Sequence, residues 1–403
     1  MNNLGSTSTK NIVAFTGGGT GGHIYPGIAV IQNLQKILND SVASGESQSA
    51  CRIIWIGACT GMDRSIVESF GIEFFGIKCG KLRRYFSPKN FFDVFNIIAG
   101  IFQAVKILKK TCIDAKRQSN KQKVVFLFSK GGFVSVPPVI AAMLLNIPIW
   151  THESDFSPGL ATKINSHFAQ KICLAYEKTA CYFNKAMQRK LFVCGNPVRP
   201  VFYSGSINRG KEYLRVSDDS KILLVLGGSQ GAKEINDLIK SSLSELTKYY
   251  FVVHQTGKQE ISIDDYISAI CGTESKNYLP LEYIFDQMPN VLAAADLVIG
   301  RSGAGTVWEC AALGRPMILI PLCGQSTRGD QVQNAQCFTD LGAAIMLVHP
   351  STKTLCDTIV DLQNNPHKLS SMKASASKAG KINAGEIIAK SIVDFLQNNE
   401  AKQ

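Results

Sequence analysis

Near its start the chain reads Asn11-Ile12-Val13-Ala14-Phe15-Thr16-Gly17-Gly18-Gly19-Thr20-Gly21-Gly22-His23. This is an apolar run that ends in a glycine-rich turn, and a helical pattern from Pro26 to Leu38 follows it. A strand, a glycine turn and a helix start form the opening unit of a doubly wound α/β domain. We therefore predict such a domain in the first half of the chain.

The second half of the chain repeats this order. Lys221 to Leu226 is another apolar run that ends in Gly227-Gly228-Ser229-Gln230-Gly231-Ala232, and a second helical pattern follows. With 403 residues the chain is also too long for one ordinary hydrophobic core. Both observations predict an α/β protein with two Rossmann-like, doubly wound parallel-sheet domains that face each other across a cleft.

Further short apolar runs bounded by glycine or proline predict the other strands of the two sheets. They are Ile53 to Gly57, Val124 to Phe128, Ile147 to Trp150, Lys171 to Leu174, Leu191 to Cys194, Phe251 to Gln255, Leu297 to Gly300, Met317 to Ile320 and Ala343 to Val348. Helical patterns lie between most of them, which indicates parallel sheets with right-handed crossovers.

We place the domain boundary near Gly195-Asn196-Pro197, where the strands of the first half end. The predicted N-terminal domain is then 1–196 and the C-terminal domain 197–380. The remaining segment, 381–403, contains an amphipathic helix from Ala384 to Asn398, for which packing back on the N-terminal domain is one arrangement to test.

The composition is that of a globular enzyme, with 45% hydrophobic and 18% charged residues. Its 12 cysteines are scattered, without a Cys-x-x-Cys pair or a nearby His at metal-ligand spacing. We interpret them as reduced thiols of a cytosolic protein. The polar start, Met1 to Lys10, lacks the apolar stretch of a secretory signal, so we expect no export.

The uncharged stretch Phe133 to Trp150 reaches the lower length limit of a membrane span. Prolines at 137 and 138 suit the first turn of a helix, and Asn146 and Pro148 would end it. We therefore predict a helix followed by a short buried strand in place of a membrane span.

The formal net charge of +12 is unevenly distributed. Between Lys78 and Lys123 there are twelve Lys or Arg residues against Asp93 and Asp114, a net charge of +10. The same region holds an apolar, aromatic face at helical spacing: Phe91, Phe92, Phe95, Ile98, Phe102 and Val105, flanked by Lys106, Lys109 and Lys110. Such a helix suits an anionic membrane surface, although a core helix with a basic rim would look the same. Nucleic acid is disfavoured, because no recognisable binding module accompanies the charge.

The first glycine turn contains Gly-x-Gly-x-x-Gly at Gly17, Gly19 and Gly22. A dinucleotide site would also need an acidic residue at the end of the second strand, and Ile53 to Gly57 ends without one. We therefore expect no NAD and no other cofactor. Glycines at a strand-to-helix turn supply backbone donors at a positive helix end, which suits a diphosphate or another polar ligand. Tight turning alone is the plainer explanation of these glycines.

A third loop, Arg301 to Glu309, follows the strand at Leu297 to Gly300. Its small residues would let a ligand lie against backbone amides, and the Glu309 carboxylate could accept both hydroxyls of a ribose or serve as a surface carboxylate. No two aspartates are separated by one residue, so the metal clamp of one class of sugar-nucleotide enzymes is missing. We expect no metal, with leaving-group charge met by helix ends and backbone donors.

Two histidines lie in predicted ligand-side loops. His23 ends the first glycine turn, where a neutral imidazole could take a proton from an acceptor hydroxyl, or simply hydrogen bond. His152-Glu153-Ser154-Asp155 follows the strand at Ile147 to Trp150. A loop at a strand end lies on the ligand side of an α/β sheet.

These motifs together resemble the MurG family of N-acetylglucosaminyltransferases over nearly the whole chain, from about Ile12 to the C-terminal helix. The segments that occur in the family's order and spacing are Gly18 to Gly22 with His23 and Pro26, Gly195 to Arg199, Gly227 to Ala232, Arg301 to Glu309, and Gln331 with Asn334-Ala335. The ordered set is far more specific than any one of its members.

The resemblance implies a GT-B fold, with an N-terminal domain for the lipid acceptor and membrane and a C-terminal domain for the UDP-sugar. It implies inverting, metal-independent transfer of N-acetylglucosamine from UDP-N-acetylglucosamine to the 4-hydroxyl of undecaprenyl-diphospho-N-acetylmuramoyl-pentapeptide, at the cytoplasmic side of the inner membrane. By motif position it implies donor contacts from Thr20, Gly21, Gly22, Asp155, Arg199, Ser229, Ala304, Gly305, Thr306, Val307, Trp308, Glu309 and Gln331, and a backbone contact of Phe285 to uracil.

Three features depart from the family pattern. Ser154-Asp155 stands where the family commonly has Gln-Asn, and an aspartate cannot donate a hydrogen bond as asparagine can. Phe133 and Val136 stand where Tyr and Gly are usual, and the loop 321–330 is longer than in many members. His23 is the first candidate for the catalytic base, with Glu153 and Asp155 as alternatives. Another GT-B enzyme, such as a UDP-sugar epimerase, and a non-catalytic UDP-sugar-binding scaffold are the rival functions.

Overall fold

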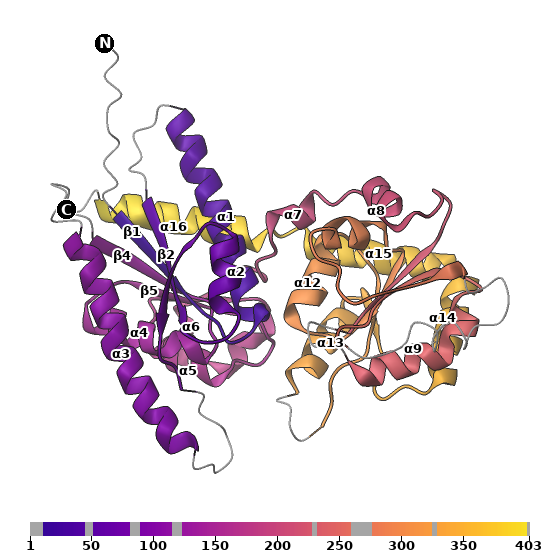
Figure 1. Ribbon diagram of the computed structural model, residues 1–403, viewed down its shortest axis with the longest axis horizontal. Coiled ribbons are helices and arrows are strands. Elements are labelled where there is room, and N and C mark those ends of the chain that lie inside the picture. Colours follow the sequence, from indigo (N-terminus) through magenta and orange to yellow (C-terminus); the bar gives the residue numbers. More distant parts are fainter. Residues whose placement is uncertain are drawn as a thin grey trace. The chain divides into compact units, whose positions relative to one another are not determined.

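The computed structural model describes residues 11–44, 51–80, 89–114, 123–227, 232–258, 276–324 and 329–400. They form two compact units, each a parallel sheet flanked by helices (Figure 1). The first unit comprises the chain up to Arg199 and resumes at Asn383, and the second is Pro200–Ile382.

The first unit contains a seven-stranded sheet in the order β3-β2-β1-β4-β5-β6-β7. Its strands are β1 (Asn11–Thr16), β2 (Cys51–Ala58), β3 (Glu73–Ile77), β4 (Lys123–Ser129), β5 (Ile149–Glu153), β6 (Lys171–Leu174) and β7 (Leu191–Val193). Its helices are α1 (Gly21–Ala43), α2 (Asp63–Ser69), α3 (Lys89–Asp114), α4 (Val136–Leu144), α5 (Leu160–Phe168), α6 (Lys185–Gln188) and α16 (Ala384–Glu400), with 3-10 turns η2 (Phe133–Ser135) and η3 (Glu177–Tyr182).

The second unit contains a six-stranded sheet in the order β10-β9-β8-β11-β12-β13. Its strands are β8 (Ile222–Leu226), β9 (Phe251–Gln255), β10 (Tyr278–Leu281), β11 (Leu297–Gly300), β12 (Met317–Leu319) and β13 (Ala344–Met346). Its helices are α7 (Pro200–Tyr203), α8 (Ile207–Leu214), α9 (Lys233–Leu246), α11 (Met288–Ala294), α12 (Ala304–Ala312), α13 (Asp330–Asp340), α14 (Thr352–Asn364) and α15 (Pro366–Gly380).

Each sheet is built around a strand that is apolar on both faces. Every residue of β1 and of β8 is buried, because helices cover both sides of a parallel sheet. The pairing is parallel throughout the described strands: Thr16 of β1 lies opposite Ile56 of β2 and Ser129 of β4. The carboxyl ends of these strands therefore meet at one edge of the first sheet, where the predicted glycine turn lies.

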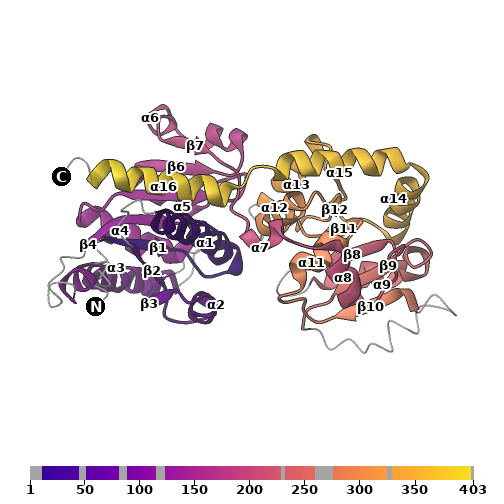
Figure 2. The same cartoon turned by 90° about the horizontal axis from the view of Figure 1, so that it is seen from above.

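The final helix, α16, packs against the first unit, and Figure 2 shows it beside α1. Ile388 and Ile392 of α16 are fully buried in the same core as β1. The Phe395 ring lies 5.5 Å from that of Phe126 and 5.6 Å from that of Trp150, in the tilted or edge-on geometries that aromatic pairs prefer. The last segment of the chain thus completes the core of the first unit.

Some boundaries differ from the sequence prediction. The fifth strand does not end at Trp150 but continues to Glu153, so His152 and Glu153 are strand residues; their side chains are buried and hydrogen-bonded, which an apolar pattern does not reveal. Helix α1 begins at Gly21, five residues before the predicted start, and includes His23 in its first turn. The edge strands β3 and β10 were not predicted, since they are only five and four residues long and contain Gly76 and Pro280, which weaken a strand pattern.

The stretch at 133–150 forms η2, α4 and the start of β5, as predicted. Across the described residues, no helix is both long enough and apolar enough to cross a membrane. Four of the six predicted face residues of helix α3 are exposed: Phe91 by 66%, Phe95 by 57%, Ile98 by 46% and Phe102 by 71%. Val105 is half-buried against the core, and the Phe92 side chain lies outside the described part of the chain. The four exposed side chains are not core residues, and α3 instead contributes Ala104 and Leu108 to the core.

Candidate functional site

A buried carboxylate, that of Asp63, holds the first glycine turn by hydrogen bonds. Asp63 is 1% exposed, and its Oδ1 accepts the Gly19 N–H at 3.0 Å. Its Oδ2 accepts the Ala58 N–H at 3.1 Å. Burial raises the pKa of Asp63, and the two backbone N–H groups oppose that rise. A side chain at Gly18 would meet this carboxylate, since an ideal Cβ there lies 1.9 Å from Oδ2.

The residues of the glycine turn that follow Gly18 are largely exposed to solvent. Gly19, Thr20 and Gly22 are exposed, and Gly21 begins helix α1. The first N–H groups of a helix have no partners within the helix, and they attract anions. The geometry therefore suits the predicted binding role of Thr20, Gly21 and Gly22.

His23 is half-buried in the first turn of α1, beside a second pair of glycines. Gly131 and Gly132, after β4, have φ angles of +85° and +77°, a backbone conformation that favours glycine. A Cβ at Gly132 would lie 2.9 Å from Cδ2 of His23, so glycine is needed here for the backbone to approach the ring. The loop after β4 thus packs closely against the imidazole.

Arg199, at the end of the first unit, is also close to α1. Its guanidinium lies over the ring of Tyr25, 4.7 Å from the centroid, in a cation–π contact. Tyr25 is two residues from His23. The structure therefore brings Arg199 to the same end of α1 as the glycine turn.

The end of β5 is tied by hydrogen bonds to its surroundings. His152 donates from Nε2 to the Gly195 carbonyl at 2.9 Å, and burial holds the pKa of His152 well below its usual value. Glu153 accepts the N–H groups of Asp155 and Gly159, each at 3.0 Å. With both oxygens engaged in shaping the loop, Glu153 is better suited to a structural role than to proton transfer. Asp155 is half-buried at the tip of this segment.

In the second unit, the loop after β11 leads into helix α12, which begins at Ala304. Val307 and Trp308 point into the core: Val307 is fully buried, and the Trp308 ring packs edge-on against Phe338 at 5.6 Å. Their side chains serve packing, so a ligand contact from either one would have to come from its backbone. Gly305, Thr306 and Glu309 are half-buried.

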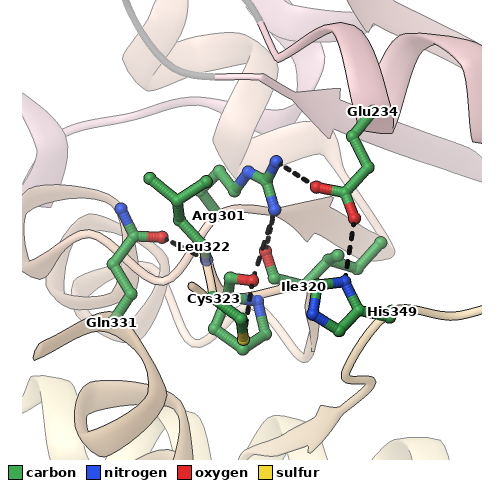
Figure 3. Close-up of polar contacts among 8 residues, drawn as sticks. Glu234, Arg301, Ile320, Leu322, Cys323, Gln331 and His349 are labelled. Atoms are coloured by element: carbon green, nitrogen blue, oxygen red, sulfur yellow. Dashed lines mark hydrogen bonds and ion pairs between the residues drawn. The ribbon is translucent and has the colours of Figure 1, made fainter. Parts of the chain in front are cut away.

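Arg301 connects three segments of the second unit (Figure 3). One guanidinium nitrogen donates to the carbonyls of Ile320 and Pro321 at 3.1 and 3.3 Å. The other donates to Oε2 of Glu234 at 2.7 Å, and the second oxygen of Glu234 lies 3.3 Å from Nδ1 of His349. Hydrogen bonding to Arg301, and secondarily to His349, lowers the pKa of Glu234.

Gln331 joins the same group of loops. Its Oε1 accepts the N–H of Leu322 at 2.9 Å, as Figure 3 shows, and its carbonyl accepts the Ser302 hydroxyl at 2.7 Å. Asn334 donates to the Ser302 carbonyl at 3.2 Å. Gln331 therefore holds the loop after β12 against the loop after β11.

Two predicted residues stand apart from these contacts. Phe285 is 76% exposed, and its ring packs against Tyr283. Ser229 lies outside the described residues, as does most of the second glycine turn. Throughout the described ranges, no three His, Cys, Asp or Glu side chains are grouped so that they could hold a metal ion.

Sequence reasoning missed Asp63 and Glu234. Asp63 is the first acidic residue after β2, six positions after the predicted strand end, and it supports the glycine turn instead of a ribose. Its position in the segment that follows β2, two residues after Gly61, was the available signal. Glu234 follows the second glycine turn at the start of α9, but its pairing with Arg301, 67 residues away, leaves no trace in the local pattern.

Two family models match the chain. The glycosyltransferase family 28 N-terminal domain matches residues 13–174, and the glycosyltransferase family 28 C-terminal domain matches residues 222–387. Among curated relatives, the UDP-N-acetylglucosamine–N-acetylmuramyl-(pentapeptide) pyrophosphoryl-undecaprenol N-acetylglucosamine transferase of Treponema pallidum (strain Nichols) is 48% identical over 346 residues, covering 85% of this chain and 84% of that protein. The enzyme of the same name from Treponema denticola is 43% identical and covers 96% of this chain and 97% of that protein.

Solved structures resemble the chain over nearly its whole length. The crystal structure of Acinetobacter baumannii MurG gives a TM-score of 0.69 at 24% identity, covering 96% of this chain and 99% of that one. The UDP-GlcNAc 2-epimerase from Neisseria meningitidis gives 0.63 at 16% identity, covering 95% and 100%. These likenesses concern the fold, and they confirm the predicted GT-B class of two Rossmann-like domains.

Proposed function

Because the chain belongs to glycosyltransferase family 28, and within it to the UDP-N-acetylglucosamine–N-acetylmuramyl-(pentapeptide) pyrophosphoryl-undecaprenol N-acetylglucosamine transferases, we propose that it makes the disaccharide lipid precursor of peptidoglycan. It is an N-acetylglucosaminyltransferase whose donor is UDP-N-acetylglucosamine and whose acceptor is the undecaprenyl-linked muramyl-pentapeptide. The identity of 43% with the Treponema denticola enzyme, across both domains, carries this conclusion. The reaction is a step of cell-wall biogenesis.

The transfer needs one bond to form and one to break. In the proposed reaction the 4-hydroxyl oxygen of the muramyl sugar attacks the anomeric carbon of N-acetylglucosamine, and the bond from that carbon to the diphosphate breaks. The hydroxyl proton goes to a base, and UDP leaves with the bonding electron pair. Attack from the face opposite the diphosphate inverts the anomeric configuration.

We assign the base to His23. An imidazole titrates near neutral pH, which suits a general base. His23 is half-buried at the end of the first sheet where the glycine turn is exposed, and the glycines after β4 pack closely against its ring. Glu153 is a weaker candidate, since backbone N–H groups occupy both of its oxygens.

We assign stabilisation of the leaving diphosphate to the second unit, where the N-terminus of α12, at Ala304, presents backbone N–H groups with a positive helix dipole. Fixed donors of this kind stabilise developing negative charge without reorganising. In the first unit, Arg199 and the N-terminus of α1, at Gly21, remain predicted donor contacts. In the second unit, Glu309 is assigned to the ribose and the Phe285 backbone to uracil.

The rival functions share the fold. A UDP-GlcNAc 2-epimerase has a TM-score of 0.63 with this chain, so fold alone does not separate epimerase from transferase. The relatives of 36–48% identity are named as transferases, and this favours transfer. A scaffold without activity would bind UDP-sugar and make no product.

The test is to incubate the purified full chain with UDP-N-acetylglucosamine and a short-chain muramyl-pentapeptide lipid, and to measure disaccharide product. The wild type should form product, and His23→Ala should lose about 100-fold or more in kcat, since general bases contribute at least about that factor. His167→Ala is the matched control, because His167 is exposed on α5 of the same unit. UDP binding without product would favour the scaffold, and product with full activity in His23→Ala would remove His23 as base.

We also propose that the α3 face formed by Phe91, Phe95, Ile98 and Phe102 binds the anionic cytoplasmic surface of the inner membrane. These side chains are exposed, and Lys106 and Lys109 on the same helix are exposed as well. Apolar side chains inserted at the headgroup level and basic side chains at anionic lipids act together in such helices.

Vesicle flotation tests this surface. The wild type should float with vesicles that contain phosphatidylglycerol and should float less with neutral vesicles or at high salt. Phe95→Ser combined with Phe102→Ser should abolish flotation, whereas Leu341→Ser, an exposed apolar site in the second unit, should not. Equal flotation of both variants would place the membrane contact elsewhere.

A further inference from the structure

Lys130 is a buried charged side chain that the site described above does not use. It follows β4 directly, is 1% exposed and is among the largest fully buried side chains of the described residues. Lysine is almost never fully buried unless it is paired, because removing the ammonium from water is costly. Its retention at this position therefore calls for a role.

The ammonium of Lys130 starts a chain of hydrogen bonds between strand ends. Its Nζ donates to the Ser154 hydroxyl at 2.5 Å. Ser154 in turn donates to Oδ1 of Asn196 at 2.6 Å, and both residues are buried. The segment after β5 and the segment after β7 are thus linked through a side chain that comes from the end of β4. A parallel bond joins His152 to the Gly195 carbonyl.

The residues that Lys130 connects are neighbours of the proposed donor contacts. Ser154 precedes Asp155, and Asn196 is three residues before Arg199. On its other side, Lys130 is followed by the two glycines that pack against the His23 ring. A shift of Lys130 would therefore move three segments of the site together.

We propose that Lys130 is a positioning residue for the transfer reaction, and that its ammonium fixes the segments that carry Asp155 and Arg199. This inference rests on the proposed function. It also accounts for Ser154 at a position where the family commonly has glutamine, since a short hydroxyl is what the buried ammonium and Asn196 can share.

Charge is part of the role. Burial lowers the pKa of Lys130 to about 8, while the nearby carboxylates of Glu153 and Asp155 favour the ammonium form. The other titratable groups that face it are His152, which burial keeps neutral, and the thiols of Cys173 and Cys194; the contact with Cys173 and burial raise the pKa of Cys194 well above its usual value. Lys130 is therefore the group in this cluster that should change charge just above neutral pH.

The experiment compares steady-state kinetics of the full chain with those of Lys130→Met and Ser154→Ala, from about pH 6.5 to about pH 9.5. Methionine keeps most of the length of the side chain without its charge. Lys163→Met, at an exposed lysine on α5, is the matched control and should retain wild-type kcat and KM. Circular dichroism and UDP binding establish that each variant is folded.

The wild type should lose kcat/KM for UDP-N-acetylglucosamine as pH rises through about 8, following the pKa of Lys130. Lys130→Met should be at least about tenfold lower near neutral pH and should lack this alkaline limb. Ser154→Ala should be reduced as well, and the double variant should be no worse than Lys130→Met, because both changes break the same chain of bonds.

Wild-type kcat/KM in Lys130→Met, or an alkaline limb that it shares with the wild type, would overturn the proposal. If Lys130→Met does not fold, Ser154→Ala is the deciding variant. An unchanged kcat/KM in Ser154→Ala would overturn the proposal. If the wild type binds UDP but forms no disaccharide, the proposed function fails separately. UDP affinity then replaces kcat/KM, and an equal pH dependence of affinity in the wild type and Lys130→Met would overturn the role of Lys130.

Discussion

Replacing Asp63 by asparagine should loosen the glycine turn that carries Thr20, Gly21 and Gly22. In the native structure one oxygen of Asp63 accepts the Gly19 N–H at 3.0 Å and the other accepts the Ala58 N–H at 3.1 Å. Asparagine has the same shape but presents one oxygen and one NH₂ group. One of the two backbone N–H groups would then face a donor and lose its acceptor.

The size of the effect follows from burial. An unsatisfied buried N–H costs about 1–3 kcal/mol. Against this, burial raises the pKa of Asp63, so a neutral side chain avoids part of the cost of the buried carboxylate. We expect Asp63→Asn to destabilise the turn by about 1–2 kcal/mol and Asp63→Ala, which removes both acceptors, by about 2–4 kcal/mol.

Amide hydrogen exchange is the suitable assay, because a protein of two units need not unfold in one step. Exchange at Gly19 and Ala58 should be roughly 5–30 times faster in Asp63→Asn, the factor that 1–2 kcal/mol provides. Turnover should fall by at least about tenfold, because small displacements of positioning groups slow catalysis strongly.

Asp40→Asn is the control for this prediction, since Asp40 is exposed on α1 of the same unit. It should leave both exchange and turnover within about twofold of the wild type, as surface substitutions generally do. If Asp63→Asn and Asp40→Asn give the same exchange rates at Gly19, the carboxylate does not hold the turn and the reasoning is refuted.

Three further predictions concern other parts of the chain. Glu234→Gln should raise the KM for UDP-N-acetylglucosamine about two- to fivefold with little change in kcat. The effect is small because Glu234 is partly exposed and its pair with Arg301 is worth no more than about 1 kcal/mol. An unchanged KM in steady-state kinetics would contradict this prediction. Trp308→Ala should destabilise the second unit by about 3–5 kcal/mol in urea denaturation, since it empties a buried site; a change below about 1 kcal/mol would show that the ring is not part of the core. Lys130 has a pKa of about 8 in the folded protein and 10.5 when unfolded, so the folded state releases its proton first as pH rises. Its contribution to the stability of the wild type is therefore fully present above pH 10.5 and is lost as pH falls through about 8, a difference of roughly 3 kcal/mol. The stability of the wild type relative to Lys130→Met in thermal melting should therefore rise between about pH 7 and about pH 10, and a constant difference would count against the buried ammonium.

The sequence allowed the two sheets to be predicted because their central strands are apolar on both faces. β1 and β8 are continuous buried runs, each followed by glycines. Both the run of apolar residues and the glycines after it indicate a strand. β3 and β10 lie at sheet edges, span only five and four residues, and contain Gly76 and Pro280, which weaken a strand pattern. The end of β5 escaped prediction for a different reason, since His152 and Glu153 are polar but buried with hydrogen-bonding partners.

The positions of candidate site residues could be predicted where they lie together in one segment of the sequence. The glycine turn and the loop before α12 are each local and lie at strand ends as expected, whereas His23 lies in the first turn of α1. The contacts of Asp63 with Gly19 and of Glu234 with Arg301 join residues 44 and 67 positions apart. Such partners are set by the parallel register and the helix packing, and a single sequence gives no direct signal of them.

The most direct test of the central claim is the stereochemistry and metal dependence of the transfer itself. The purified chain would be incubated with UDP-N-acetylglucosamine, a short-chain muramyl-pentapeptide lipid and a metal chelator, and the product would be examined by NMR. We predict UDP release matched by a disaccharide whose new linkage has the anomeric configuration opposite to that of the donor. Retention of configuration, loss of product with the chelator, or UDP release without disaccharide would contradict an inverting, metal-independent N-acetylglucosaminyltransferase.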